Sequence, residues 1–233
     1  MKIEIADIVI ELEAKYPFVS SLTEEYRTDL PTDVHVCVKD FEIEDAARRY
    51  GEPDYAAESI AIYSRIADAL PRYDAILMHG AAIVDGEVAY LITAPSGVGK
   101  TTHVNNWISS FGDKVYVLNG DKPVIRYFDG IPYVCGTPWR GKEGMGVREK
   151  KRLGAIVVFR RGEINRAVQV RPEDVSEKLL SQIYVPRGIE EMQLALSILD
   201  KLLSDIPLFV AECNMETSSA SVVRDAIARA KHE

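Results

Sequence analysis

The sequence has few cysteines: Cys37, Cys135 and Cys213 are the only three in 233 residues, and they lie far apart. Their odd number and wide spacing fit reduced thiols and offer no local metal-ligand spacing of the kind found in zinc sites. We therefore expect a cytoplasmic protein.

Long apolar segments are also missing. No segment approaches the ~18 consecutive apolar residues that a membrane-spanning helix requires. The first five residues alternate charged and apolar side chains, and they lack the apolar core of a signal peptide. We find no internal repeat and no low-complexity tract. The sequence thus predicts no membrane partner.

Excess positive charge is absent as well. The chain has 28 Lys and Arg against 36 Asp and Glu, which gives a formal net charge of −8. This balance argues against a general nucleic-acid partner. Hydrophobic residues make up 47% and charged residues 27% of the chain, as in ordinary globular proteins. The length fits one compact domain, which we divide into an N-terminal part, 1–74, and a core, 75–233.

The most informative stretch is a glycine-containing loop over 94–102, between an apolar run at 88–93 and a helical pattern that stops at Gly112. A strand, a glycine-rich loop with Lys-Thr and a helix form the arrangement that binds phosphates through backbone N–H groups. Ala94 stands where the strict pattern has its first glycine. A glycine-rich turn with an exposed lysine is the alternative. The predicted nucleotide-binding residues are Ser96, Gly97, Val98, Gly99, Lys100, Thr101 and Thr102.

Two of these residues have specific expected roles. Lys100 supplies a positive charge for the outer phosphates, and the Thr101 hydroxyl is a ligand for Mg²⁺. An apolar strand at 115–118 then leads to Asp121, which we expect at the same edge of the sheet as a second Mg²⁺ ligand. The alternative for Asp121 is to cap the turn before Pro123.

The strand before the loop is the second arm of a hairpin. The apolar runs 75–84 and 88–93 flank Asp85-Gly86, a strong hairpin signal. This favours a mixed sheet over the parallel sheet of Ras-like folds. His79 falls within the first apolar run, where it is either a hydrogen-bonded core residue or a site residue.

The other elements follow from periodicity and turn residues. The first third contains no motif, and we expect it to complete a sheet and cover one face of the core. The expected strands are 2–12, 34–38, 124–127, 131–135, 155–159 and 208–211, and the expected helices are 54–70, 173–184, 189–204 and one from about 217. His103, in the first turn after the loop, is expected to be exposed or packed rather than catalytic.

The segment 136–146 holds four glycines and two cations, Arg140 and Lys142, beside Trp139. We predict a mobile lid in which Trp139 anchors the loop and the cations stabilise the transferring phosphoryl group, as an arginine finger does. The alternative is a solvated surface loop.

Taken in order, these motifs resemble the HPr kinase/phosphorylase family of the phosphoenolpyruvate-carboxykinase-like P-loop group. The matching features are His79-Gly80, the loop 96–101, Gly120-Asp121 and the segment 136–139, so the resemblance covers roughly 75–160. It implies an α/β fold with a mixed β-sheet, a P-loop and flanking helices. It also implies an ATP- and Mg²⁺-dependent kinase that transfers the γ-phosphoryl group to a hydroxyl.

Two positions depart from the family pattern. The family carries adjacent aspartates at the strand end, one for the metal and one for the acceptor proton, whereas this chain has Asp121 followed by Lys122. Pro95 stands where the family usually has an acidic residue. The resemblance therefore leaves open whether Asp121 or His79 accepts the proton.

The acceptor is open too: a serine of a protein or peptide, or a small molecule such as free serine. Homo-oligomerisation and phosphorylase activity are not decided by the sequence. The alternative function is a nucleotide-binding regulatory module without phosphotransfer, which the missing second aspartate favours. Carboxykinase chemistry ranks last, because the chain is far shorter than those enzymes and shows no His/Lys set for a second metal.

Overall fold

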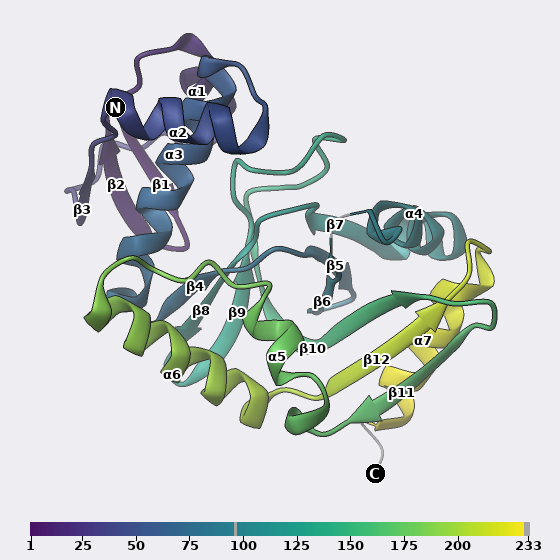
Figure 1. The fold of residues 1–233 in the computed structure, drawn as a ribbon. Helices are drawn as coiled ribbons and strands as arrows, with labels where there is room; N and C mark the ends of the chain where they lie inside the picture. Colours follow the sequence, from purple (N-terminus) through teal and green to yellow (C-terminus); the bar gives the residue numbers. More distant parts are fainter. Residues whose placement is uncertain (96, 231–233) are drawn as a thin grey trace.

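The computed structural model describes residues 1–95 and 97–230, which form a mixed α/β fold with two sheets (Figure 1). The larger, nine-stranded sheet follows the order β4-β8-β9-β10-β6-β5-β7, and β12 and β11 extend it beyond β10. Its strands are β4 (Ala75–Leu77), β5 (Ala81–Asp85), β6 (Val88–Thr93), β7 (Val115–Asn119), β8 (Val124–Phe128), β9 (Ile131–Cys135), β10 (Lys150–Arg161), β11 (Arg166–Val170) and β12 (Leu208–Cys213).

Strand β6 confirms the predicted hairpin and the mixed sheet. It pairs antiparallel with β5 and parallel with β10. Gly86 has φ +65°, a left-handed conformation that glycine adopts without the cost of a Cβ. Strand β7 pairs antiparallel with the other side of β5 and therefore runs parallel to β6. The carboxyl ends of β6 and β7 consequently lie at the same edge.

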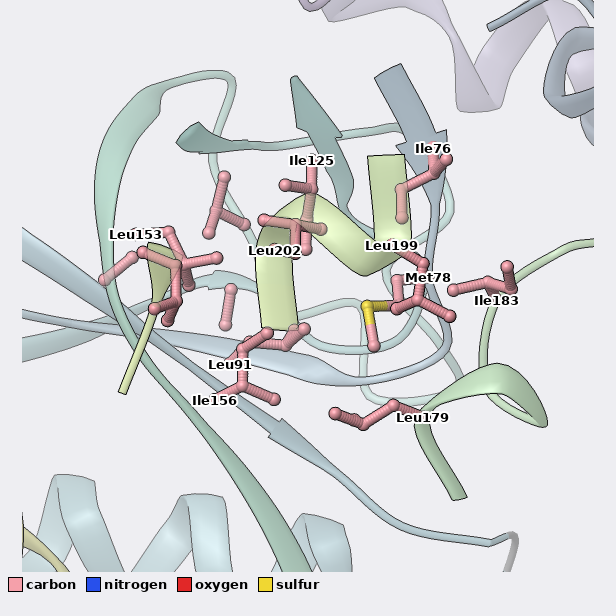
Figure 2. Packing of buried hydrophobic residues seen from close by; sticks show 14 of the residues in the cluster. Ile76, Met78, Leu91, Ile125, Leu153, Ile156, Leu179, Ile183, Leu199 and Leu202 are labelled. Atoms are coloured by element: carbon pink, nitrogen blue, oxygen red, sulfur yellow. The ribbon is translucent and has the colours of Figure 1, made fainter. Parts of the chain in front are cut away.

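Helices cover both faces of the larger sheet. Side chains of β6 alternate between two clusters, with Ala89 and Leu91 on one face and Tyr90 and Ile92 on the other. The first face packs against α5 (Ser176–Leu180) and α6 (Ile189–Asp205), and Figure 2 shows Leu199 and Leu202 of α6 among the strand residues. The second face packs against α4 (Lys100–Phe111) and α7 (Ser218–Ala230). Burial on both faces makes β6 a rigid base for the loop that follows it.

Residues 1–74, here called the N-terminal unit, form a sheet of their own instead of completing the larger one. The predicted strand 2–12 is wrong in one respect: Ala6 and Asp7 take positive φ and split it into a hairpin. The unit packs on the larger sheet through a cluster that includes Ile62 and Trp139. Its elements are β1 (Lys2–Ile5), β2 (Ile8–Leu12), β3 (Val34–Val36), α1 (Pro17–Leu22), α2 (Asp40–Tyr50) and α3 (Asp54–Ala69), with short 3₁₀ turns at Glu24–Tyr26 and Leu70–Tyr73.

Some elements differ from the sequence prediction. The single helix expected over 173–184 is wrong: a 3₁₀ turn at Pro172–Asp174 and the short α5 are followed by an irregular segment. Ile183 is buried and forms a β-bridge with Met78, which draws this segment onto the sheet edge. Helix α2 and strand β11 were not predicted. A Glu42 carboxylate that accepts the Lys39 N–H marks the start of α2, and Gly51 with φ +67° ends it.

Within the described residues, every helix is either too short or too polar to cross a bilayer.

Helix α4 is fixed to the core by a buried polar network at His103. The Trp107 indole N–H donates to His103 Nε2 at 3.1 Å, and His103 Nδ1 lies 3.2 Å from the Ser219 hydroxyl of α7. His103 is 1% exposed and packs on Phe159, with the two ring centroids 4.7 Å apart. His103 is thus a packing residue, and both of its ring nitrogens are used in holding α4 against α7.

Acidification should destabilise the fold through His103. Burial lowers the pKa of His103 from 6.5 to about 4. The unfolded chain therefore binds a proton that the folded state excludes, and the free energy of unfolding falls as pH drops from 6.5 toward 4. The difference between the two pKa values corresponds to about 3 kcal/mol of unfolding free energy. Urea unfolding across this pH range should show a shallower fall in His103→Gln than in the wild type, and equal pH slopes would contradict this assignment.

Candidate functional site

The glycine loop, residues 94–99, joins β6 to α4. Gly97 has φ +81°, and Gly99, the residue that precedes the helix, has φ +109°. Both values lie in the region that favours glycine, so the two glycines allow the chain to reverse into the helix N-terminus. Val98, Thr101 and Thr102 are half-buried around this turn. Ser96 lies outside the described residues. The loop thus presents the first backbone N–H groups of a twelve-residue helix at the carboxyl edge of β6.

Lys100, the first residue of α4, directs its side chain toward β5 and β7. Its Nζ lies 3.1 Å from His79 Nε2 and 3.8 Å from Asp121 Oδ1. The side chain is only 11% exposed, and burial lowers the Lys100 pKa, an effect that Lys122 adds to and Asp121 opposes. Lys100 is therefore held by its neighbours inside the site rather than extended into solvent.

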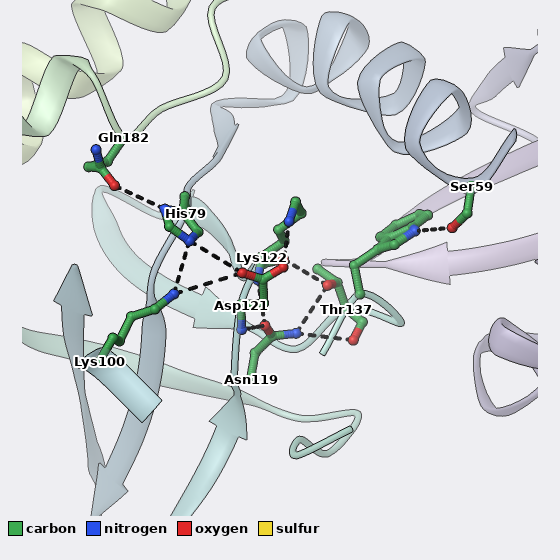
Figure 3. Close-up of polar contacts among 9 residues, drawn as sticks. Ser59, His79, Lys100, Asn119, Asp121, Lys122, Thr137 and Gln182 are labelled. Carbon is green, nitrogen blue, oxygen red and sulfur yellow. Dashed lines mark hydrogen bonds and ion pairs between the residues drawn. The ribbon is translucent and has the colours of Figure 1, made fainter. Parts of the chain in front are cut away.

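Asp121 follows β7 and meets Lys100 as the sequence predicted from the strand ends. Its position is set by Asn119, whose Oδ1 accepts the backbone N–H groups of Asp121 at 2.9 Å and Lys122 at 2.8 Å. Asn119 in turn donates to the Thr137 carbonyl and hydroxyl, and that hydroxyl donates to the Lys122 carbonyl (Figure 3). This buried network fixes the turn on which Asp121 sits.

Three side chains surround the Asp121 carboxylate: Lys122 forms an ion pair with Oδ2, while His79 and Lys100 lie near Oδ1. Burial alone raises the Asp121 pKa, but these neighbours more than reverse that effect and hold the pKa far below its usual range. Lys122 also lies over the Tyr63 ring, with Nζ 5.2 Å from the centroid. Asp121 is consequently ionised at neutral pH in a half-buried site.

His79 occupies the link between β4 and β5, not a strand interior as the apolar run suggested. Its backbone N–H donates to the Gln182 carbonyl at 2.7 Å, and its Nδ1 lies 3.0 Å from Gln182 Oε1. Gly80 follows because a Cβ there would stand 2.9 Å from Leu91 Cδ1 and 3.1 Å from the Ile92 carbonyl oxygen. Because strand pairing is interrupted between β4 and β5, the Gly80 N–H can donate to the Asp121 carbonyl. This bond joins the β4–β5 link to the turn after β7.

The loop 136–146 passes over Asp121 and contacts the N-terminal unit. The buried Trp139 donates from Nε1 to the Ser59 hydroxyl at 2.9 Å, so Trp139 anchors the loop as predicted. At Gly141, φ +80°, a Cβ would lie 3.1 Å from Asp121 Cβ. The loop is therefore tied to both Asp121 and helix α3.

The two cations of this loop lie apart from Lys100. Arg140 pairs with Glu25 and lies 5.9 Å from the Tyr26 ring centroid, so its guanidinium faces the N-terminal unit. Lys142 is exposed on the turn beyond it. Of the predicted catalytic residues, the structure brings together Asp121 and His79 with Lys100. Arg140 lines the same cavity as Asp121, but its guanidinium pairs with Glu25.

Two cavities adjoin this group. One, of about 360 Å³, lies beside the glycine loop and is lined by apolar residues together with basic and polar ones. The other, of about 480 Å³, lies between the N-terminal unit and Asp121. The first is lined by Ala94, Pro95, Val98, Phe159, Arg160 and Gln182 among others, and the second by Leu22, Ser59, Tyr63, Asp121, Lys122 and Trp139 among others.

Sequence reasoning missed three positioning residues: Asn119, Thr137 and Gln182. Asn119 and Thr137 lie within segments that were noted, but an asparagine at a strand end and a threonine between glycine and proline have no spacing that reveals their mutual bonds. Gln182 is 103 residues from His79 in sequence and was assigned to a helix that does not form. Only the tertiary fold brings it to the site.

No family model matches the chain, and no curated protein matches it. Among solved structures, the chain is similar to the Hpr(Ser) kinase/phosphatase from Coxiella burnetii, with a TM-score of 0.41 and 10% sequence identity. The alignment covers 67% of this chain and 93% of that one.

Proposed function

We propose that this protein is an ATP- and Mg²⁺-dependent phosphotransferase that moves the γ-phosphoryl group to a hydroxyl acceptor. One observation carries the proposal: the lysine that opens α4 behind a glycine turn lies 3.8 Å from an ionised aspartate just after β7, a strand that runs in the same direction as β6. Phosphoryl transfer requires mainly positioning and electrostatic stabilisation, and these two side chains supply opposite charges for phosphate and metal.

The backbone N–H groups of Gly97, Val98 and Gly99 and the start of α4 would hold the phosphates, because they form a helix N-terminus that favours anions. Lys100 would neutralise charge on the transferred group. The proposed roles of Ser96 and Thr102 are further phosphate contacts in the same loop.

The donor set fits a magnesium ion. Mg²⁺ binds through one or two protein oxygens together with substrate phosphates and water, and it would draw negative charge from the γ-phosphate. Asp121 supplies a carboxylate that stays ionised, and Thr101 supplies a hydroxyl in the first turn of α4. Among the described residues no cluster of three His, Cys, Asp or Glu side chains forms a metal site, so the remaining ligands would come from phosphate and solvent.

The two cavities suit the two substrates. The apolar cavity beside the glycine loop would take the nucleoside, with Phe159 and Val98 against the base. The cavity between Asp121 and the N-terminal unit would take the acceptor, because Asp121 forms its inner wall. In this arrangement the N-terminal unit has a function: it encloses the acceptor.

A second candidate is a nucleotide-binding regulatory module without phosphotransfer. The observation that favours it is the ion pair of Lys122 with Asp121, because the Lys122 ammonium already neutralises the carboxylate proposed for the metal and the proton. In such a protein, the loop 136–146 would report occupancy to the N-terminal unit through Trp139 and Ser59.

Labelled ATP distinguishes the two functions. We expect protein incubated with γ-labelled ATP and Mg²⁺ to transfer label to one of two pools, serine-containing peptides or hydroxylated metabolites. ATP labelled on the α-phosphate is the matched control and should label neither pool. ATP binding without hydrolysis or transfer would contradict the kinase proposal and support the regulatory module.

A further inference from the structure

A chain of hydrogen bonds leads away from Lys100 through the site. Lys100 Nζ contacts His79 Nε2 at 3.1 Å, and His79 Nδ1 contacts Gln182 Oε1 at 3.0 Å (Figure 3). Gln182 Nε2 then donates to the Ser181 hydroxyl at 3.0 Å, and that hydroxyl donates to the Lys178 carbonyl at 2.7 Å. The chain thus joins the start of α4 to the end of α5.

The two ends of this series of hydrogen bonds determine which atoms donate and which accept. A carbonyl oxygen only accepts, so the single hydroxyl proton of Ser181 is committed to Lys178. The Gln182 amide must therefore turn its NH₂ to Ser181 and its oxygen to His79 Nδ1. At the other end an ammonium only donates, and Lys100 Nζ at 3.1 Å is nearer to His79 Nε2 than Asp121 Oδ1 at 3.4 Å, so His79 Nε2 accepts from Lys100. Both ends require the same neutral imidazole, with the proton on Nδ1 and a lone pair on Nε2.

We propose that Gln182 is a positioning residue that, by accepting the Nδ1 proton of His79, commits His79 Nε2 to hold the Lys100 ammonium at the phosphate site. This inference rests on the proposed function for the identity of the ligand, which is ATP. An ammonium has three donors. One is held by His79 and another faces Asp121 Oδ1, so the third remains for a phosphate oxygen.

The same geometry decides between the two proton acceptors that the sequence left open. The Nε2 lone pair of His79 is occupied by Lys100, so His79 orients a cation instead of receiving the acceptor proton. The charged groups that face His79 are Lys100 from α4 and Asp121 after β7, with Lys122 behind that carboxylate. Asp121 lines the acceptor cavity, and each of its carboxylate oxygens has two lone pairs, so Oδ2 can accept a hydroxyl proton beside its ion pair with Lys122. The proton of the acceptor hydroxyl is therefore assigned to Asp121 and not to His79.

Substitutions at His79 separate holding a cation from accepting a proton. The amide oxygen of His79→Gln can accept from Lys100 but cannot take up a proton at neutral pH, whereas His79→Leu does neither. We expect His79→Leu to weaken ATP affinity by about tenfold or more, the effect of losing a hydrogen bond to a charged group, and His79→Gln to restore most of that loss. A kcat that falls about 100-fold or more in His79→Gln would overturn the inference, because that is the loss expected of a general base.

Gln182 is tested by the tautomer of His79. Nitrogen NMR of the ligand-free wild type should show a protonated Nδ1 and a bare Nε2, and Gln182→Leu should mix the tautomers and weaken ATP affinity. Gln193→Leu, on the exposed face of α6, is the matched control. A protonated Nε2 in the wild type, or unchanged nitrogen shifts in Gln182→Leu, would overturn the inference. Neither the nitrogen shifts nor the ATP affinity depends on phosphotransfer. A protein that binds ATP as expected but transfers no label would therefore contradict only the kinase proposal.

Discussion

Replacing Lys100 with alanine should lower ATP turnover by about a thousandfold. Loss of one preorganised cation or donor at a phosphoryl or oxyanion site costs about a thousandfold in rate, and Lys100 is the cation that the structure places at the start of α4. Steady-state hydrolysis and label transfer with γ-labelled ATP measure the effect.

The fold should tolerate this change. Lys100 is largely buried, and burial lowers its pKa. Keeping this buried ammonium charged destabilises the folded state, and alanine removes that destabilisation. Asp121 retains its ion pair with Lys122 in the variant. Thermal unfolding should therefore change little. Lys114→Ala, an exposed lysine just after the same helix, is the control and should keep full turnover. Full turnover in Lys100→Ala would exclude phosphate binding at this loop.

The central part of the fold was predictable because its signals are local. The Asp85-Gly86 turn, the apolar run of β6 and the glycines before Lys100 are adjacent in sequence, and each specifies a backbone shape by itself. Those signals were enough to place Lys100 and Asp121 at one sheet edge, and the structure confirms that placement. The hairpin also led to the mixed sheet, which is confirmed.

Features that depend on distant contacts were missed or misplaced. The apolar run 75–84 contains no breaker before Gly80, yet the chain divides there because Gly80 packs on Leu91 and Ile92 and bonds to Asp121. The segment 173–184 has helical periodicity, but Ile183 pairs with Met78 instead. Arg140 was expected to face the phosphates from its position in a glycine-rich loop. Its pairing with Glu25 depends on an N-terminal unit that carries no motif.

Replacing Asp121 with asparagine should lower ATP turnover by at least about a thousandfold, because the site then loses the carboxylate proposed for both the metal and the acceptor proton. Asparagine keeps the size of the side chain, and the backbone N–H of residue 121 remains bonded to Asn119. Asp113→Asn, at an exposed position after α4, is the matched control. Rates measured against Mg²⁺ concentration should show a saturable increase in the wild type and none in Asp121→Asn.

A double variant separates the loss of the carboxylate from the charge that the loss leaves behind. In Asp121→Asn, the ammonium of Lys122 loses its ion-pair partner, and repulsion between Lys122 and Lys100 alone would disturb the site. Adding Lys122→Met removes that charge and keeps an apolar stem against Tyr63. If Asp121 acts through its carboxylate, the double variant stays as inactive as Asp121→Asn. If turnover returns, Asp121 serves only to neutralise Lys122, and its assignment as the metal ligand and proton acceptor is wrong.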